Sequence, residues 1–160
     1  MKQRLTDEVM ALRVVKEFND GDHVILGAGL PNLCALFIPE EKDVFFCAEN
    51  GVFGYGHLLA AGEWEKADFD YVDAGYRFFA TLPGMSLSDM GTSLDIIRGA
   101  HLDFAVLGAL EVSEKGDLAN WTLGSVHSIV YLWTVKCQPS NPLFFLYNQF
   151  LTAHLVFLQC

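Results

Sequence analysis

The first third of the chain alternates between helical and strand-like spacing of its apolar residues. Apolar side chains recur at every third position from Val9 to Phe18, which predicts a helix over residues 6–19. Thr6 is a suitable N-cap, because its hydroxyl can accept a backbone N–H of the first turn. The short, mostly apolar run at residues 23–26 is typical of a buried strand.

A second strand and helix follow in the same order. The turn at residues 27–31 ends in Pro31, which suits the first position of a helix running to residue 37. Residues 44–47 form the next apolar run and predict a second strand. Helices alternating with strands indicate an α/β fold with parallel strands, in which ligands bind at the carboxyl ends of the strands.

The pattern weakens between residues 55 and 69, which we interpret as a loop. Beyond it, the apolar spacing predicts four further elements. They are a strand over residues 78–82, a helix over 91–98 with Thr92 or Ser93 near its start, a strand over 101–109, and a hairpin over 111–121 that turns at 115–117.

Glu49 is the clearest candidate for a catalytic residue in this pattern. It follows the second strand and precedes Asn50 and Gly51, so the strand delivers a carboxylate to a glycine-bearing turn. Glycine there allows a substrate to approach the main chain. We interpret Glu49 as a catalytic nucleophile, and the alternative is a solvated turn carboxylate. Gly27 and Gly29 lie at the end of the preceding strand, where they allow either close approach of a substrate or a tight turn.

The charge of the chain excludes some classes of function. Its formal net charge is −10, and it lacks the basic stripe that marks a nucleic-acid or anionic-membrane binding surface. Its four cysteines form no C-x-x-C pair, so no metal site is expected. The N-terminal residues lack the apolar core of a secretory signal, which predicts a cytoplasmic protein.

The composition changes sharply near Gly124. All 20 acidic residues precede it, and Lys136 is the only one of the 10 lysines and arginines that follows it. We therefore predict one domain over residues 1–124, followed by an atypical apolar tail over residues 125–160. The continuous apolar sequence of the tail is shorter than a membrane span of ~20 residues. An ill-matched segment, such as translated out-of-frame or intron sequence, is the favoured interpretation over a membrane anchor.

Three stretches in order carry a resemblance to a known family. The first is Gly27-Ala28-Gly29-Leu30-Pro31, and the second is Glu49-Asn50-Gly51-Val52-Phe53-Gly54. The third runs from Ser93 to Trp121 and ends in Gly-Asp-Leu-Ala-Asn-Trp. Over about residues 5–124 the chain resembles the β subunit, or β half, of family I CoA-transferases. It is most similar to the 3-oxoacid group, which includes succinyl-CoA:3-ketoacid and 3-oxoadipate CoA-transferases.

The resemblance implies a fold and a chemistry. The fold would be a three-layer α/β domain with a parallel-rich sheet, cut short at its C-terminus. Glu49 would attack an acyl-CoA thioester and form first a glutamyl anhydride and then a glutamyl-CoA thioester. Coenzyme A would be a substrate, with no permanently bound cofactor, and an α subunit would complete the site. The residues expected to bind CoA or substrate, or to shape the site, are Gly27, Gly29, Asn50, Gly51 and Gly108.

The chain also departs from the pattern of this family. Cys47 and Ala48 stand where the family usually has His or Gln and then Ser. The family continues after Asn-Trp with a Gly-Gly segment that supplies an oxyanion-hole amide, whereas the resemblance here ends near Gly124. The alternative function is therefore a catalytically silent fragment or an interaction-only protein. A sugar-phosphate isomerase of related fold has no motif in its favour.

Overall fold

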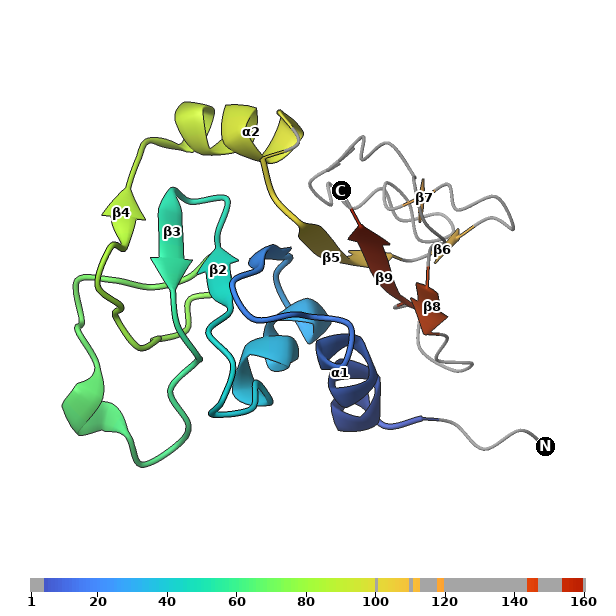
Figure 1. The fold of residues 1–160 in the computed structure, drawn as a ribbon, viewed down its shortest axis with the longest axis horizontal. Coiled ribbons are helices and arrows are strands. Elements are labelled where there is room, and N and C mark those ends of the chain that lie inside the picture. Colours follow the sequence, from blue (N-terminus) through green and yellow to red (C-terminus); the bar gives the residue numbers. More distant parts are fainter. Residues whose placement is uncertain are drawn as a thin grey trace, which may run out of the picture.

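The fold is built around a mixed β-sheet with helices on both of its faces (Figure 1). The computed structural model describes residues 5–99 and 101–109, together with the backbone of residues 111–112, 118–119, 144–146 and 154–159. The helical elements are α1 (Asp7–Val15), α2 (Met90–Arg98) and the 3-10 helices η1 (Leu30–Leu36) and η2 (Trp64–Lys66).

The main sheet has seven strands in the order β4-β3-β2-β1-β5-β9-β8. Their bounds are β1 (His23–Leu26), β2 (Phe45–Cys47), β3 (Val52–Tyr55), β4 (Ser86–Leu87), β5 (Phe104–Ala109), β8 (Phe144–Leu146) and β9 (His154–Gln159). A separate antiparallel pair joins β6 (Glu111–Val112) to β7 (Leu118–Ala119).

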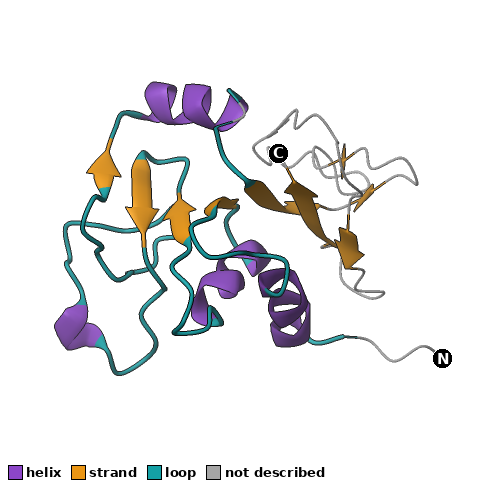
Figure 2. Ribbon diagram, in the orientation of Figure 1, coloured by secondary structure: helices purple, strands orange, loops and turns teal. Residues whose placement is uncertain are grey.

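The centre of the sheet is parallel, as the sequence predicts for an α/β fold. β1 pairs in parallel with β2 on one side and with β5 on the other. The outer strands β3, β4, β8 and β9 are antiparallel, so the whole sheet is mixed (Figure 2). β1, β2 and β5 therefore present their carboxyl ends along one edge.

Alternate residues of the central strands pack into two separate apolar clusters. Val24 and Leu26 of β1 lie in the larger cluster with residues of α1 and η1. Ile25, between them, lies in the smaller cluster with Ile97 of α2. Because successive strand side chains point to opposite faces, the sheet packs against apolar residues on both faces, which is consistent with an α/β fold.

Both α-helices begin at residues whose side chains satisfy a free backbone N–H. The Thr6 hydroxyl accepts the N–H of Val9, as the sequence predicts for the start of α1. The N-cap of α2 is Asp89, whose carboxylate accepts the N–H of Thr92. Thr92 and Ser93 lie near the start of this helix, as predicted, but inside its first turn.

Other predicted elements differ in extent or type. The helix expected after Pro31 is the 3-10 helix η1, and the helix expected over residues 6–19 ends at Val15. The strand predicted over residues 78–82 is wrong, because Phe79 makes only an isolated bridge to Leu58. The predicted hairpin is confirmed by β6 and β7, while its turn lies outside the described residues.

The described part of residues 125–160 joins the main sheet. β9 runs antiparallel to β5 over six residue pairs, from Phe104 with Gln159 to Ala109 with His154, and β8 pairs with β9. The domain boundary at residue 124 and the truncation of the fold stay predictions, because most of this segment lies outside the described residues. Within the described part of the chain, no helix is long and apolar enough to cross a membrane.

Candidate active site

Glu49 lies at the tip of the tight connection between β2 and β3. The turn closes because the N–H of Gly51 donates to the carbonyl of Ala48 at 3.0 Å, and the N–H of Ala48 donates to the carbonyl of Val52 at 2.8 Å. Cys47 and Phe53 are paired across the two strands immediately below the turn. The local sequence thus folds as predicted, with a strand that delivers the carboxylate to a turn.

Gly51 is the residue that permits this turn. Its φ of +103° lies in the left-handed region that glycine adopts without a steric penalty. The carbonyl oxygen of Ser88 lies 2.0 Å from the position that a Cβ would take. The N–H of Ser88 also donates to the carbonyl of Gly51 at 2.8 Å, so the turn is pressed directly against the chain that leads into α2.

The other predicted site residues lie at the same edge of the sheet. Because β1, β2 and β5 are parallel neighbours, the turns at Gly27–Gly29 and Glu49 follow the carboxyl ends of β1 and β2 at one edge. Gly108 lies within β5, one residue before its carboxyl end. Gly29 has a φ of +90°, which favours glycine there. Gly27 donates its N–H to the carbonyl of Val106, at 2.9 Å, which ties the first turn to β5.

Burial gives Glu49 an unusual electrostatic setting. Its side chain is half-buried, and burial raises the pKa of its carboxyl group. Among the described residues, no hydrogen bond or ion pair opposes this effect. When this carboxyl group is ionised, it has no fixed partner among the described residues and can attack an electrophile.

Cys47 does not compete with Glu49 as a nucleophile. The thiol is buried, and burial raises its pKa to about 12. A thiol with this pKa is protonated at neutral pH, and the thiolate is the reactive form. The departure from the family at this position therefore leaves Glu49 as the nucleophile candidate of the turn.

Besides the backbone contact with Ser88, two side-chain hydrogen bonds hold the Glu49 turn from outside, and only one of them comes from a residue predicted for the site. The side-chain amide of Asn50 donates to the carbonyl of Val72 at 2.9 Å, so Asn50 shapes the site through its own side chain. The hydroxyl of Ser93, which is fully buried, donates to the carbonyl of Ala48 at 3.1 Å. The sequence places Ser93 only near a helix start, since nothing local links it to a residue 45 positions earlier.

The Ser93→Ala substitution is expected to destabilise the protein by about 1 kcal/mol, because one buried hydrogen bond to the turn is lost. Urea unfolding measures this change. Ser88→Ala is the matched control, because its hydroxyl donates at 3.2 Å to the carbonyl of Asp89 at an exposed position. Equal effects of the two substitutions would contradict a specific role for Ser93.

Asp103, which directly precedes β5, lies away from this edge. Its carboxylate accepts the N–H of His23 at 2.8 Å and so joins the beginnings of β5 and β1. No group of three or more potential metal ligands occurs among the described residues. The candidate site is therefore built from one carboxylate, glycine-bearing turns and backbone groups.

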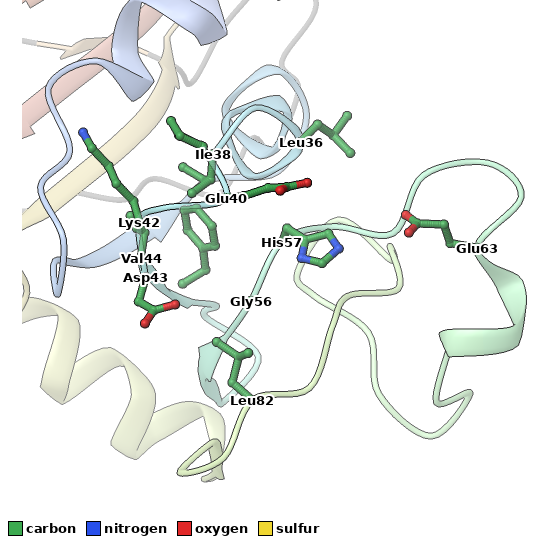
Figure 3. A pocket seen from close by; sticks show the side chains of 12 residues that line it. Leu36, Ile38, Glu40, Lys42, Asp43, Val44, Gly56, His57, Glu63 and Leu82 are labelled. Atoms are coloured by element: carbon green, nitrogen blue, oxygen red, sulfur yellow. The ribbon is translucent and has the colours of Figure 1, made fainter.

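A hollow of about 470 Å³ lies near the other end of β2 (Figure 3). It is lined by the segment that precedes this strand, from Ile38 to Val44, and by His57 and Glu63 of the loop after β3. Figure 3 shows the Glu63 carboxylate directed toward the His57 ring. Glu49 does not line this hollow, so it is a feature separate from the candidate active site.

Comparisons with known proteins agree with the motifs at this edge. The family model described as coenzyme A transferase matches residues 8–131, which extends past Gly124 where the resemblance was expected to end. The chain is 40% identical over 126 residues to the B subunit of the 3-oxoadipate CoA-transferase of Acinetobacter baylyi, covering 79% of this chain and 57% of the relative.

Two further relatives show the same degree of similarity. The B subunit of a probable succinyl-CoA:3-ketoacid coenzyme A transferase of Bacillus subtilis is 42% identical over 114 residues, or 71% of this chain and 51% of the relative. The beta subunit of the acetate CoA-transferase of Escherichia coli is 40% identical over 122 residues, which cover 76% of this chain and 51% of the relative. The chain spans a little more than half the length of these relatives. On its motifs and these matches, the chain belongs to the coenzyme A transferase family.

Proposed function

We propose that this chain is the β subunit of a CoA-transferase that moves CoA between an acyl-CoA and a carboxylic acid. The observation that carries the proposal is the half-buried Glu49 carboxylate, held at a strand-end turn in a chain of this family. The names of the relatives support 3-oxoacyl or succinyl groups as the substrate class, since they include 3-oxoadipate and succinyl-CoA:3-ketoacid transferases. The family match favours this function over a catalytically silent fragment.

The proposed reaction uses Glu49 in two successive exchanges. A carboxylate oxygen of Glu49 attacks the thioester carbon, the carbon–sulfur bond breaks, and CoA departs as the thiolate, which leaves a mixed anhydride between Glu49 and the acyl group. The thiolate then attacks the glutamyl carbonyl and releases the first carboxylate, which leaves a glutamyl-CoA thioester. A second carboxylate takes the CoA by the reverse of these steps, so each hard exchange is divided into easier ones.

The site also needs a partner subunit in this proposal. The relatives are named as B or beta subunits, which supports a hetero-oligomer with an α subunit. That partner would supply the other wall of the cleft and exclude water, which would otherwise hydrolyse the anhydride. Coenzyme A enters as a substrate, and the assembly would act in the cytoplasm.

Chemical trapping tests the proposed function. The full chain is mixed with an α-type partner and with acetoacetyl-CoA or succinyl-CoA, and the glutamyl-CoA thioester is captured with hydroxylamine as a hydroxamate. Mass spectrometry of the peptide that contains Glu49 is expected to show the modification. Glu63, a loop carboxylate paired with Lys66, serves as the internal control and is expected to stay unmodified. A folded complex with no modification of Glu49 would contradict the proposal.

The acidic limb of the pH–rate profile is expected to lie above the ordinary pKa of a glutamate. Only the ionised form of Glu49 is a nucleophile, and burial raises the pKa of this carboxyl group. The rate should therefore fall as the pH drops through that raised pKa. Measurement of kcat/KM against pH checks this prediction. An acidic limb at or below the ordinary pKa of a glutamate would show that burial does not set the pKa of Glu49 in the free enzyme.

A further inference from the structure

A buried amide–carboxylate pair joins η1 to the segment that contacts Asn50. The side-chain amide of Asn32 donates to Oδ2 of Asp73 at 3.0 Å, across 41 residues of sequence. Only 1% of Asn32 and 2% of Asp73 is exposed to solvent. Buried polar side chains are costly unless they are fully hydrogen-bonded, so this contact holds the two segments together.

Asp73 also organises the turn that follows it. Its other oxygen, Oδ1, accepts the backbone N–H groups of Gly75 and Arg77, each at 2.8 Å. Burial raises the pKa of the Asp73 carboxyl, while these N–H groups and the charge of Arg77 act in the opposite direction. One carboxylate thus fixes the backbone at two points and the η1 helix at a third.

The turn held by Asp73 contains strained backbone. Tyr76 has a φ of +60°, the only positive value at a non-glycine residue among those described, and 87% of it is exposed. Its N–H donates to the carbonyl of Asp73, and the N–H of Asp73 donates to the carbonyl of Arg77. A strained conformation persists only where its surroundings determine it, and here the Asp73 contacts do so.

Gly75 allows the close approach that this arrangement requires. The side-chain nitrogen of Asn32 lies 2.1 Å from the position that a Cβ on Gly75 would take. Asn32, Asp73 and Gly75 are therefore fitted to one another, and any larger residue at position 75 must displace the Asn32 amide.

This cluster connects the two turns of the candidate active site. Asn32 lies in η1, directly after the turn at Gly27–Pro31 that ends β1. Asp73 is bonded through one peptide to Val72, whose carbonyl accepts the side-chain amide of Asn50. A continuous path of hydrogen bonds and one peptide unit thus runs from Asn32 in η1 to the residue next to Glu49.

We propose that Asn32 and Asp73 are positioning residues that fix the Glu49 turn relative to the Gly27–Pro31 turn. The proposal rests on the proposed function for its catalytic consequence, although its structural part is independent of that function. Loss of either side chain releases the turn over residues 72–77, and the carbonyl of Val72 no longer holds Asn50 in place.

The structural part is tested by amide hydrogen exchange over residues 48–51 in the full chain. Asn32→Ala and Asp73→Asn are each expected to speed exchange at the N–H of Gly51 by about tenfold, as local opening becomes easier. The matched control is Asn19→Ala, which removes another Asn–Asp contact, that of Asn19 with Asp22 at an exposed position. Unchanged exchange at Gly51 in both variants would overturn the proposal.

A double substitution separates positioning from general loss of fold. Gly75→Ala alone is expected to speed exchange at Gly51, because the new methyl group displaces the Asn32 amide. In the Asn32→Ala background, the same change should have little further effect, since the group it displaces is gone. Additive effects of the two substitutions would show that the residues do not act through one contact.

The catalytic part is tested with the complex of the chain and its α-type partner. Misplacement of Glu49 is expected to lower the rate of its modification by acetoacetyl-CoA by about 10²-fold in Asp73→Asn, with KM little changed. If wild-type Glu49 is not modified at all, the proposed function fails, and the exchange experiment still decides the structural proposal. If the wild type is modified and Asp73→Asn reacts at the same rate, the positioning role is wrong.

Discussion

The Glu49→Gln variant is expected to lose CoA transfer by about 10⁴-fold or more in kcat/KM while keeping its fold. Glutamine has nearly the same shape as glutamate, so the turn between β2 and β3 and its contacts to Val72 and Ser88 are preserved. The amide is not a nucleophile and cannot form the anhydride. Steady-state kinetics of the complex with the α-type partner measures this loss.

The same variant should be at least as stable as the wild type at neutral pH. Burial raises the pKa of Glu49, so the folded state disfavours the ionised form of this group. Stability from this group is present at acidic pH and declines as the pH rises through the raised pKa. Neutral glutamine removes this cost, and a marked drop in the melting temperature would contradict the explanation.

The Gly51→Ala substitution is expected to destabilise the protein by about 3–5 kcal/mol, through left-handed strain and a direct clash. The added Cβ would lie 2.0 Å from the carbonyl oxygen of Ser88, which belongs to rigid backbone. Either Ser88 or the Glu49 turn must move, so activity should fall together with stability. Urea unfolding and transfer kinetics measure the two effects.

Gly62→Ala is the matched control for this prediction. Gly62 has a φ of +100°, close to the +103° of Gly51, and no atom lies within 4 Å of the position of its added Cβ. This control isolates the cost of left-handed backbone, about 1–2 kcal/mol, and should leave transfer activity unchanged. Equal losses at the two glycines would show that contact with Ser88 contributes nothing.

The turn that carries Glu49 could be predicted from sequence because its determinants are local. An apolar run, a carboxylate, Asn50 and Gly51 lie within a few residues, and they specify a strand end, a reactive group and a turn. The order of the helix and strands before Glu49 also indicated parallel pairing. β1 and β2 confirm this pairing, and it brings the two glycine-bearing turns to one edge.

The strand predicted over residues 78–82 failed because its apolar residues do not pair regularly. Ala80 exchanges backbone hydrogen bonds with Gly56 and His57, and Phe79 makes a single bridge to Leu58. The apolar composition of this segment indicates contact with the core, but it does not specify regular backbone pairing with a neighbouring strand. The N-cap of α2 was missed for a different reason: Asp89, a strong N-cap residue, could have been recognised three positions before Thr92.

The supports of the Glu49 turn could not be predicted, because they depend on residues far apart in the sequence. Nothing near Asn32 signals Asp73, and nothing near Ala48 signals Ser93. Each residue alone is an ordinary polar side chain that becomes informative only when the fold buries it. Asn32, Asp73 and Ser93 support the turn only through these hydrogen bonds, and the hydrogen bonds exist only because the fold brings η1, α2 and the sheet together.

The long sequence separation of these supports has a consequence for how the protein folds. Contacts that close 41 and 45 residues of chain carry a large loop-closure entropy, so they form after the local turn and helices. The peptide around Glu49 can bend into its turn early, yet the hydrogen bond from Ser93 to this turn forms only after the intervening chain has folded. A growing chain that has not yet reached Ser93 therefore has the Glu49 carboxylate without this support for its turn.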